Sequence, residues 1–205
     1  MSLSLWGAFA ATVVLLAISP GPGAAAVMSA GMGHRFVVAF RVVLGLQVAL
    51  LLQLTIVAAG VGALLAASET AFAAVRWLGA AYLIWLGLRK FRETPRPITE
   101  RPATSQGKWF WQGVLVNLSN PKAIVFIGAL VPQFLDLHRP QLPQYLIIAA
   151  TMCVIDTAVM SGYGLLGSRL AGLLADPGRL RWASRMFGTA FVGLGAGLLL
   201  SGRSA

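Results

Sequence analysis

The stretch Ser19-Pro20-Gly21-Pro22-Gly23 interrupts the apolar run 3–32 close to its middle. Each proline removes a backbone donor and clashes with the preceding helical turn, and each glycine adds backbone freedom, so an α-helix has to break here. Within a membrane, broken backbone is tolerated only where it is buried in protein or lines a wet cavity. If this run crosses a membrane, the break therefore marks a functional site.

The stretch Asn117-Leu118-Ser119-Asn120-Pro121-Lys122 repeats this interruption about 100 residues later, inside the apolar run 109–131. Paired interruptions at corresponding places in two halves of a chain are the best sequence pointer to the substrate site of a transporter. We therefore expect a substrate to be held at the two breaks, near the middle of the membrane.

The composition is that of an integral membrane protein. Of the 205 residues, 58% are hydrophobic and 11% are charged, and the mean hydropathy is +0.79, whereas soluble domains are about half apolar and about a quarter charged. The net charge of +10 comes from basic residues between the apolar runs, which indicates membrane topology and not a nucleic-acid partner. The single cysteine, Cys153, excludes an intrachain disulfide, and we expect no cofactor and no metal site.

Six apolar segments each reach or approach the ~20 residues that a helix needs to cross about 30 Å of hydrocarbon. They are residues 4–32 (broken at 20–23), 39–66, 71–88, 109–131 (broken at 119–121), 144–168 and 184–201. The first segment lacks the basic residues that precede the apolar core of a signal peptide, so we interpret it as a membrane helix. The sequence thus predicts an all-α membrane protein of six transmembrane helices, with the first and fourth helices broken.

Basic residues set the predicted orientation. The connector 89–108 carries six of them and three prolines, and the positive-inside rule places such a connector in the cytoplasm. Twelve basic residues then lie inside, three lie outside, and Lys122 is left within the membrane. Both termini are predicted to be extracytoplasmic. The twelve are Arg35, Arg41, Arg89, Lys90, Arg92, Arg96, Arg101, Lys108, Arg169, Arg179, Arg181 and Arg185.

The two halves of the chain resemble each other. Arginine, glycine, alanine and aromatic residues recur at the same spacing in 76–83 (RWLGAAYL) and 185–192 (RMFGTAFV), an offset of 109 residues. Because each half has an odd number of crossings, the halves point in opposite directions, as in transporters built from inverted repeats. We expect one transport domain over 1–205, with repeat one at 1–88, a cytoplasmic linker at 89–108 and repeat two at 109–205.

Four motifs follow one another along the chain: Pro20-Gly21-Pro22, 79–87 (GAAYLIWLG), 117–122 (NLSNPK) and Pro132-Gln133-Phe134. Together, in order and spacing, they closely resemble the LysE/RhtB family of bacterial amino-acid exporters over nearly the whole chain. The resemblance implies a six-helix permease of the bacterial inner membrane that exports amino acids or close derivatives and is driven by the proton gradient. Family members differ in substrate, and the sequence does not select one.

A zwitterionic amino acid presents a carboxylate and an ammonium group, and both need partners once they lose water. The half-helices that begin near Gly23 and Pro121 offer unpaired N–H groups and a partial positive charge, so we expect them to hold the carboxylate. Lys122 either assists them or, alternatively, snorkels to the cytoplasmic surface or serves the structure alone. Asn120, directly before Pro121, is more simply a helix cap than a substrate ligand.

Asp156 is the only acidic residue well inside an apolar segment. A carboxylate in a membrane is functional by default, here as a proton carrier, as the counter-ion of a substrate ammonium group or as a fixed partner of Lys122. The offset of 109 residues relates Asp156 to Gln47, so the two repeats place polar groups at matched depth. The candidate substrate and translocation residues are Ser19, Pro20, Gly21, Pro22, Gly23, Gln47, Asn117, Asn120, Pro121, Lys122 and Asp156, and Asp156 is also the candidate for proton coupling.

Other functions are weighed against amino-acid export. Export of another small solute or of a cation stays open, although a metal ion would call for several acids, thiols or imidazoles where the membrane segments offer one acid. A thiol–disulfide enzyme is excluded because one cysteine cannot form the internal disulfide, and no hydrolase motif occurs, so we expect no enzymatic activity. The expected partners are the amino acid, protons and the lipid bilayer, and a homodimer contact through the glycine-rich last segment is left open.

Overall fold

The computed structural model describes residues 1–33, 36–67, 69–92, 108–136, 139–167 and 176–201, and the regular structure in these ranges is helical. The elements are α1 (Leu3–Ile18), α2 (Pro22–Gly33), α3 (Phe36–Ala67), α4 (Glu69–Arg92), α5 (Trp109–Leu118), α6 (Pro121–Val125), the π-helix η2 (Phe126–Leu130), the 3-10 helix η3 (Val131–Phe134), α7 (Gln141–Leu165) and α9 (Pro177–Ser201). The predicted all-α fold class is confirmed. Residues 93–107 of the predicted connector, together with Arg35, Arg169 and Arg203, lie outside the described residues.

Both predicted helix breaks are present. α1 ends at Ile18 and α2 begins at Pro22, with a bend of 53° between them; α5 ends at Leu118 and the helix that follows begins at Pro121, again with a bend of 53°. Proline is favoured at the first position of a helix because its missing N–H would have no intrahelical partner there. The two prolines therefore end one helix and start the next.

The helices are consistent with insertion into a membrane. α3 and α7 are each long and apolar enough to cross one, and in the described part of the chain the number of candidate spans rises to four if each bent pair counts as one span. α4 and α9 contain 24 and 25 residues, which is long enough for about 30 Å of hydrocarbon.

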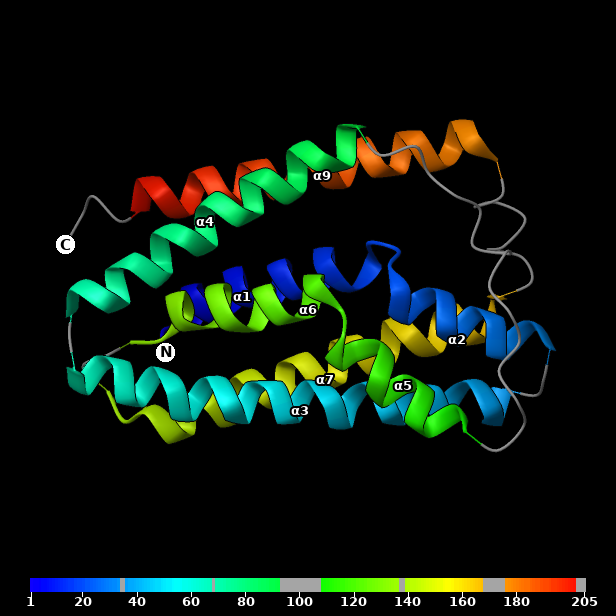
Figure 1. Ribbon diagram of the computed structural model, residues 1–205, viewed down its shortest axis with the longest axis horizontal. Coiled ribbons are helices and arrows are strands. Elements are labelled where there is room, and N and C mark those ends of the chain that lie inside the picture. Colours follow the sequence, from blue (N-terminus) through cyan, green and yellow to red (C-terminus); the bar gives the residue numbers. More distant parts are fainter. Residues whose placement is uncertain (34–35, 68, 93–107, 137–138, 168–175, 202–205) are drawn as a thin grey trace.

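Figure 1 shows how the helices are layered. α4 and α9 lie side by side along one edge of the molecule, α3 and α7 lie along the opposite edge, and α1 and α6 lie between these two pairs. α3 and α7 run in opposite directions, and so do α4 and α9. At the breaks themselves Ser19 and Asn120 are buried, whereas Ser119 and Pro121 are exposed.

Glycines allow α4 and α9 to approach closely. A Cβ atom added at Gly188 would lie 2.9 Å from the carbonyl oxygen of Gly87, and one added at Gly195 would lie 2.9 Å from the carbonyl oxygen of Ala80. These two glycines of the last helix therefore serve packing within the chain. The homodimer contact through this segment stays a prediction.

Several helix ends differ from the expected ones. α9 begins at Pro177 and not at residue 184, so Arg179, Arg181 and Arg185 lie on its first turns and not in a loop. The Asp176 carboxylate accepts a hydrogen bond from the N–H of Gly178 (2.8 Å), and a cap of this kind stabilises a helix start that hydropathy alone does not mark.

Two other helices also extend into the basic loops. α3 begins at Phe36 and so includes Arg41, and α4 continues to Arg92, past the predicted linker boundary at residue 89. Arginine has a high helix propensity and its long side chain can reach past the end of a membrane span, so a helix can run on beyond the apolar segment.

The fourth apolar run does not resume as one α-helix after its break. The short α6 is followed by the π-helix η2 and the 3-10 helix η3. Pro132 has no N–H to donate, so the regular hydrogen-bond ladder cannot continue through it. Single-turn π segments occur frequently at functional sites, and this one follows directly on the second break.

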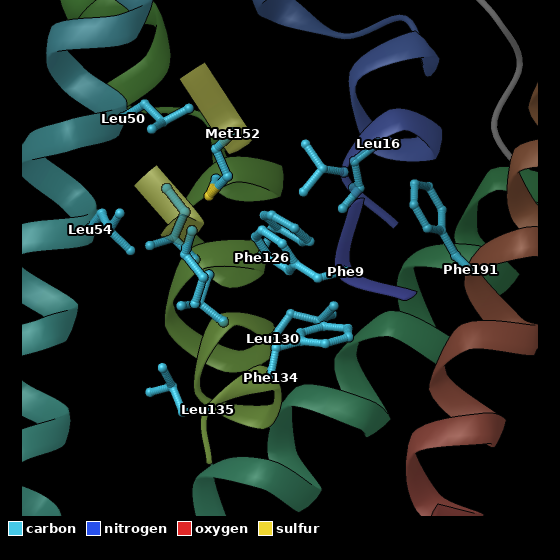
Figure 2. Close-up of a cluster of buried hydrophobic side chains, with 14 residues drawn as sticks. Phe9, Leu16, Leu50, Leu54, Phe126, Leu130, Phe134, Leu135, Met152 and Phe191 are labelled. Carbon is cyan, nitrogen blue, oxygen red and sulfur yellow. The ribbon is translucent and has the colours of Figure 1, made fainter. Parts of the chain in front are cut away.

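Two clusters of buried apolar side chains hold the helices together. The Phe9 cluster consists of Phe9, Val13, Leu16, Leu50, Leu54, Phe126, Ile127, Leu130, Val131, Phe134, Leu135, Ile148, Met152 and Phe191. The Met28 cluster consists of Ala24, Ala26, Val27, Met28, Ala30, Ala39, Val42, Val43, Leu46, Trp109, Met160 and Tyr163. Figure 2 shows the Phe9 cluster, in which the Phe9 ring stacks on Phe126 (centroids 6.4 Å apart) and meets Phe134 edge-on (5.2 Å).

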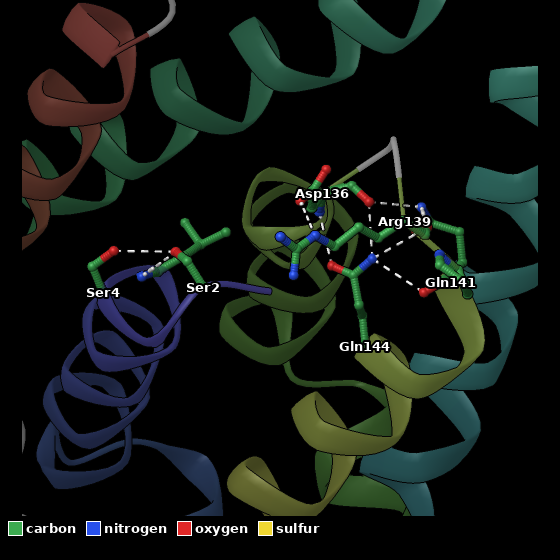
Figure 3. A network of polar contacts seen from close by, with 8 residues as sticks. Ser2, Ser4, Asp136, Arg139, Gln141 and Gln144 are labelled. Carbon is green, nitrogen blue, oxygen red and sulfur yellow. Dashed lines mark hydrogen bonds and ion pairs between the residues drawn. The ribbon is translucent and has the colours of Figure 1, made fainter.

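Gln144 orders the loop between η3 and α7. Its side chain is 3% exposed, and its Oε1 accepts a hydrogen bond from the N–H of Asp136 (2.8 Å). Its Nε2 donates to the carbonyl oxygens of Asp136 (2.8 Å), Arg139 (3.4 Å) and Pro140 (3.2 Å). Figure 3 shows this network with the ion pair between Arg139 and Asp136 (3.1 Å). One buried amide thus bonds to the backbone of three residues near the start of α7.

Replacement of Gln144 by alanine is expected to lower the free energy of unfolding by about 1–3 kcal/mol, because it removes the hydrogen bonds of one buried side chain to the part-buried N–H of Asp136 and to three carbonyl oxygens. The measurement is the thermal unfolding midpoint of the purified protein in detergent. Gln141→Ala is the matched control, since Gln141 donates to the same carbonyl oxygens of Asp136 and Arg139 that Gln144 already serves. Equal losses in the two variants would contradict the central role of Gln144.

Candidate functional site

A cavity of about 90 Å³ lies between the two helix breaks. About 10–15 Å³ of such space holds one water molecule, so the cavity has room for several waters or for a small solute. Its walls are formed by Val13, Leu16, Ala17, Ser19, Gly21, Gly23, Ala24, Leu46, Leu50, Asn117, Asn120, Lys122, Ala123, Phe126, Ile127, Met152, Asp156 and Met160.

The cavity lies at the boundary of the two apolar clusters. The Phe9 cluster contributes Val13, Leu16, Leu50, Phe126, Ile127 and Met152 to its walls, and the Met28 cluster contributes Ala24, Leu46 and Met160. A charged group in surroundings of this kind is costly unless it has a partner. The two charged residues of the wall, Lys122 and Asp156, therefore need partners.

Lys122 reaches from α6 to the broken end of α1. Its Nζ donates hydrogen bonds to the carbonyl oxygens of Leu16 and Ser19, the latter at 2.9 Å. Tyr163 of α7 donates its hydroxyl to the carbonyl oxygen of Ile18 (2.6 Å). The last carbonyls of a helix lack intrahelical partners and carry a partial negative charge. These two donors therefore take up three of the carbonyl oxygens at the end of α1, and the ammonium group lies at the break.

The start of α2 faces the cavity from the other side of the same break. Gly23 and Ala24 line the cavity, and their N–H groups belong to the first turn, which has no intrahelical acceptors. Ser19 is 2% exposed and also lines the cavity, and within the described residues its hydroxyl has no hydrogen-bond partner. The break thus presents several donors to whatever occupies the cavity.

Asp156 lies opposite, on α7, where its Oδ2 accepts a hydrogen bond from the Nε2 of Gln47 on α3 (2.7 Å). These are the two residues that the offset of 109 relates; the sequence predicted a matched depth for them, and the structure shows them in direct contact. Met152 and Met160 line the cavity one turn before and one turn after Asp156. The carboxylate is therefore set between two flexible thioether side chains on one face of α7.

The second break is held in place by amide side chains. Asn117 Nδ2 donates to the carbonyl oxygen of Leu46 (2.9 Å), and Gln53 Nε2 donates to the carbonyl oxygen of Asn117 (3.0 Å). The Oδ1 of Asn120 accepts from the N–H of Lys122 (3.1 Å), so Asn120 caps the helix that follows. The capping role predicted for Asn120 is confirmed. Asn117 also lines the cavity, but its amide nitrogen is engaged with α3.

The structure brings most of the predicted site residues together. Those in the cavity wall are Ser19, Gly21, Gly23, Asn117, Asn120, Lys122 and Asp156. Gln47 is not in the wall but is hydrogen-bonded to Asp156, which is. Pro20, Pro22 and Pro121 are also outside the wall, and their effect is on the course of the backbone.

Sequence reasoning missed the apolar wall and Tyr163. The spacing of Met152 and Met160, four residues on either side of Asp156, is a signal that could have identified them as neighbours of the carboxylate on one helix face. No local signal marks Tyr163, because its partner Ile18 is 145 residues away in the chain.

Comparison with known proteins identifies similar sequences over the full length of the chain. The sequence profile described as "LysE type translocator" matches residues 14–202. The homoserine/homoserine lactone efflux protein of Salmonella typhimurium is 40% identical, and the match covers 100% of both chains. An uncharacterized membrane protein of Vibrio cholerae is 37% identical over 95% of this chain and 96% of its own, and the leucine efflux protein of Klebsiella pneumoniae is 28% identical over 90% of each. No solved structure matches the chain.

Proposed function

The chain belongs to the LysE type translocator family, and from this premise we propose that it exports amino acids or close derivatives from the cytoplasm in exchange for protons, with the substrate held in the cavity between the two breaks. The protein is a membrane transporter and not an enzyme. The relatives named for homoserine, homoserine lactone and leucine favour substrates with an uncharged side chain.

One observation carries this proposal: the cavity presents complementary groups to both ends of a zwitterion. The N–H groups of Gly23 and Ala24 and the hydroxyl of Ser19 are donors that suit a carboxylate at a helix start. Asp156 is an acceptor that suits an ammonium group. The remaining wall is largely apolar and suits an uncharged side chain.

Proton antiport follows from the chemistry of one carboxylate that serves two cations. An ionised Asp156 attracts the substrate ammonium group, whereas a protonated Asp156 carries no charge to hold it. Substrate and proton then compete for the same group, so each crossing of the substrate is exchanged for a proton. This competition supports the role of Asp156 as the proton-coupling residue.

Alternating access is supported by the way the two halves are arranged. α3 and α7 run in opposite directions, as do α4 and α9, and each half contains a bent pair with the same angle of 53°. These features support two inverted three-helix repeats with six spans. In this scheme the Phe9 cluster and the Met28 cluster separate in turn to open the cavity to one side of the membrane. The basic connector supports an inner-membrane orientation with both termini extracytoplasmic.

Efflux from preloaded proteoliposomes tests the proposed function. The panel contains homoserine, threonine, leucine, lysine and glutamate, each measured with and without a pH gradient. We expect gradient-dependent efflux of the uncharged members, since the cavity has one group for each end of a zwitterion. The absence of efflux for every amino acid would overturn the proposal, and efflux that ignores the pH gradient would overturn its proton-coupled form.

Gln47→Leu is expected to slow efflux by about 10-fold or more. The substitution removes the hydrogen bond to Asp156, and bonds to charged groups contribute about 1.5–3 kcal/mol, where 1.4 kcal/mol is a factor of ten. The measurement is the initial efflux rate of the best substrate. Thr55→Val is the control on the same helix, because the Thr55 hydroxyl is exposed and bonds to its own helix at Leu51. Equal rates in Gln47→Leu and the wild type would contradict a role for this bond.

A further inference from the structure

We propose that the broken end of α1 is a binding site for a monovalent cation and that the Lys122 ammonium group fills it as a tethered cation. This inference deepens the proposed function and rests on it for its meaning in transport. In other transporters with broken helices, the C-terminal ends of half-helices and unwound carbonyls coordinate the coupling ion. Here a side chain of the protein itself occupies that position.

The end of α1 has the charge that a cation site requires. α1 contains 16 residues, so its dipoles add to a partial negative charge at the C-terminal end. Two carbonyl oxygens at this end, those of Leu16 and Ser19, converge on the Lys122 Nζ. A third, that of Ile18, is taken separately by the Tyr163 hydroxyl. The lysine and the tyrosine thus bind three carbonyl oxygens at this end, two and one respectively.

A second observation points to a cation ligand set and not to a simple helix cap. The hydroxyl oxygen of Ser19 is buried, lines the cavity and has no hydrogen-bond partner among the described residues. With the carbonyl oxygens of Leu16 and Ser19 it makes three oxygens from one short stretch of chain. A hydroxyl has one proton to donate and two lone pairs, so it can coordinate a cation and donate to a substrate carboxylate at the same time.

The surroundings of the Lys122 ammonium group support the same inference. α6 contains five residues, so its own dipole contributes little to the stability of the charge. The ammonium group lies at the C-terminal end of the longer α1, where a positive charge is favoured. The lysine therefore gains its electrostatic stabilisation across the interface between the two breaks, and the wild-type protein needs no free sodium ion to hold the breaks together.

Removal of the ammonium group should open the site to a free cation. We would purify Lys122→Ala in detergent and measure its thermal unfolding midpoint in N-methylglucamine chloride, sodium chloride and methylammonium chloride at constant ionic strength. We expect a lower midpoint than that of the wild type in N-methylglucamine, and a rise by several degrees with the concentration of sodium or methylammonium, because a ligand that binds only the folded state stabilises it. A larger rise with methylammonium means that the site prefers an ammonium ion, and a larger rise with sodium means that it prefers an alkali ion.

Two controls keep the inference open to refutation. Lys108→Ala removes an exposed lysine just before α5, and its midpoint, like that of the wild type, should be the same in the three salts. If the midpoint of Lys122→Ala is also the same in the three salts, the cation site does not exist. Should Lys122→Ala yield too little folded protein, Lys122→Ser also leaves the position of the ammonium group open and has the same expected and contrary results. Because this readout requires no transport, its failure is separate from failure of the export assay.

Discussion

Replacement of Asp156 by asparagine is expected to abolish efflux driven by a pH gradient. Asparagine has nearly the same shape, and its side-chain oxygen can still accept the hydrogen bond from Gln47, so the cavity keeps its geometry. What the variant loses is the group that can take up a proton and the charge that attracts an ammonium group. If the proton carrier is lost, the rate of gradient-driven efflux should fall to the rate measured with empty liposomes.

The measurement compares net efflux under a pH gradient with exchange of labelled for unlabelled substrate at equal pH. Net efflux requires the carrier to return protonated, whereas exchange does not, so we expect Asp156→Asn to lose net efflux more completely than exchange. Asp176→Asn is the control, since it removes an exposed carboxylate that pairs with Arg179 at the surface. Gradient-driven efflux at the wild-type rate in Asp156→Asn would assign Asp156 a structural role only.

Gly45→Ala is expected to leave little folded protein. A Cβ atom at Gly45 would lie 2.0 Å from the carbonyl oxygen of Phe110, and one at Gly113 would lie 2.1 Å from the carbonyl oxygen of Val42. α3 and α5 therefore cross in backbone contact at these two glycines, where no flexible side chain can move aside. Overpacking a core typically costs about 1–3 kcal/mol, and a clash between two backbones should cost at least that much.

Gly60→Ala is the matched control for this prediction. It lies on the same helix, and a Cβ atom there would have no neighbour within 4 Å. Since alanine is a better helix former than glycine by about 1 kcal/mol, Gly60→Ala should be neutral or slightly stabilising. The measurements are the yield of monodisperse protein and the unfolding midpoint. Similar midpoints for the two variants would show that α3 and α5 do not cross as closely as described.

The helix breaks could be predicted because their cause is local. Pro22 and Pro121 lack an N–H and start new helices, and this holds whatever surrounds them. The cap formed by Asn120 is also a matter of adjacent residues. The helix starts at Phe36 and Pro177 could not be placed from hydropathy, because each helix also includes arginines that lie before or near the start of its apolar segment.

The contacts of the candidate site were predictable only in part. The offset of 109 between two similar stretches of sequence related Gln47 to Asp156, and the two side chains are in contact. The role of Gln144 as the centre of the loop network could not be predicted from the sequence, because it depends on how the loop backbone is placed around this side chain.

The sequence by itself determined that the chain is an all-helical membrane protein with two broken helices, because apolar segments of spanning length and prolines act through local chemistry. Only the tertiary structure decided what the charges at the breaks contact. Lys122 could have faced a substrate or the membrane surface; instead its side chain reaches from α6 to the carbonyl oxygens of Leu16 and Ser19 at the end of α1. The partner of a buried charge depends on which helices become neighbours. The local sequence around one residue does not show which residue more than 100 positions away will contact it.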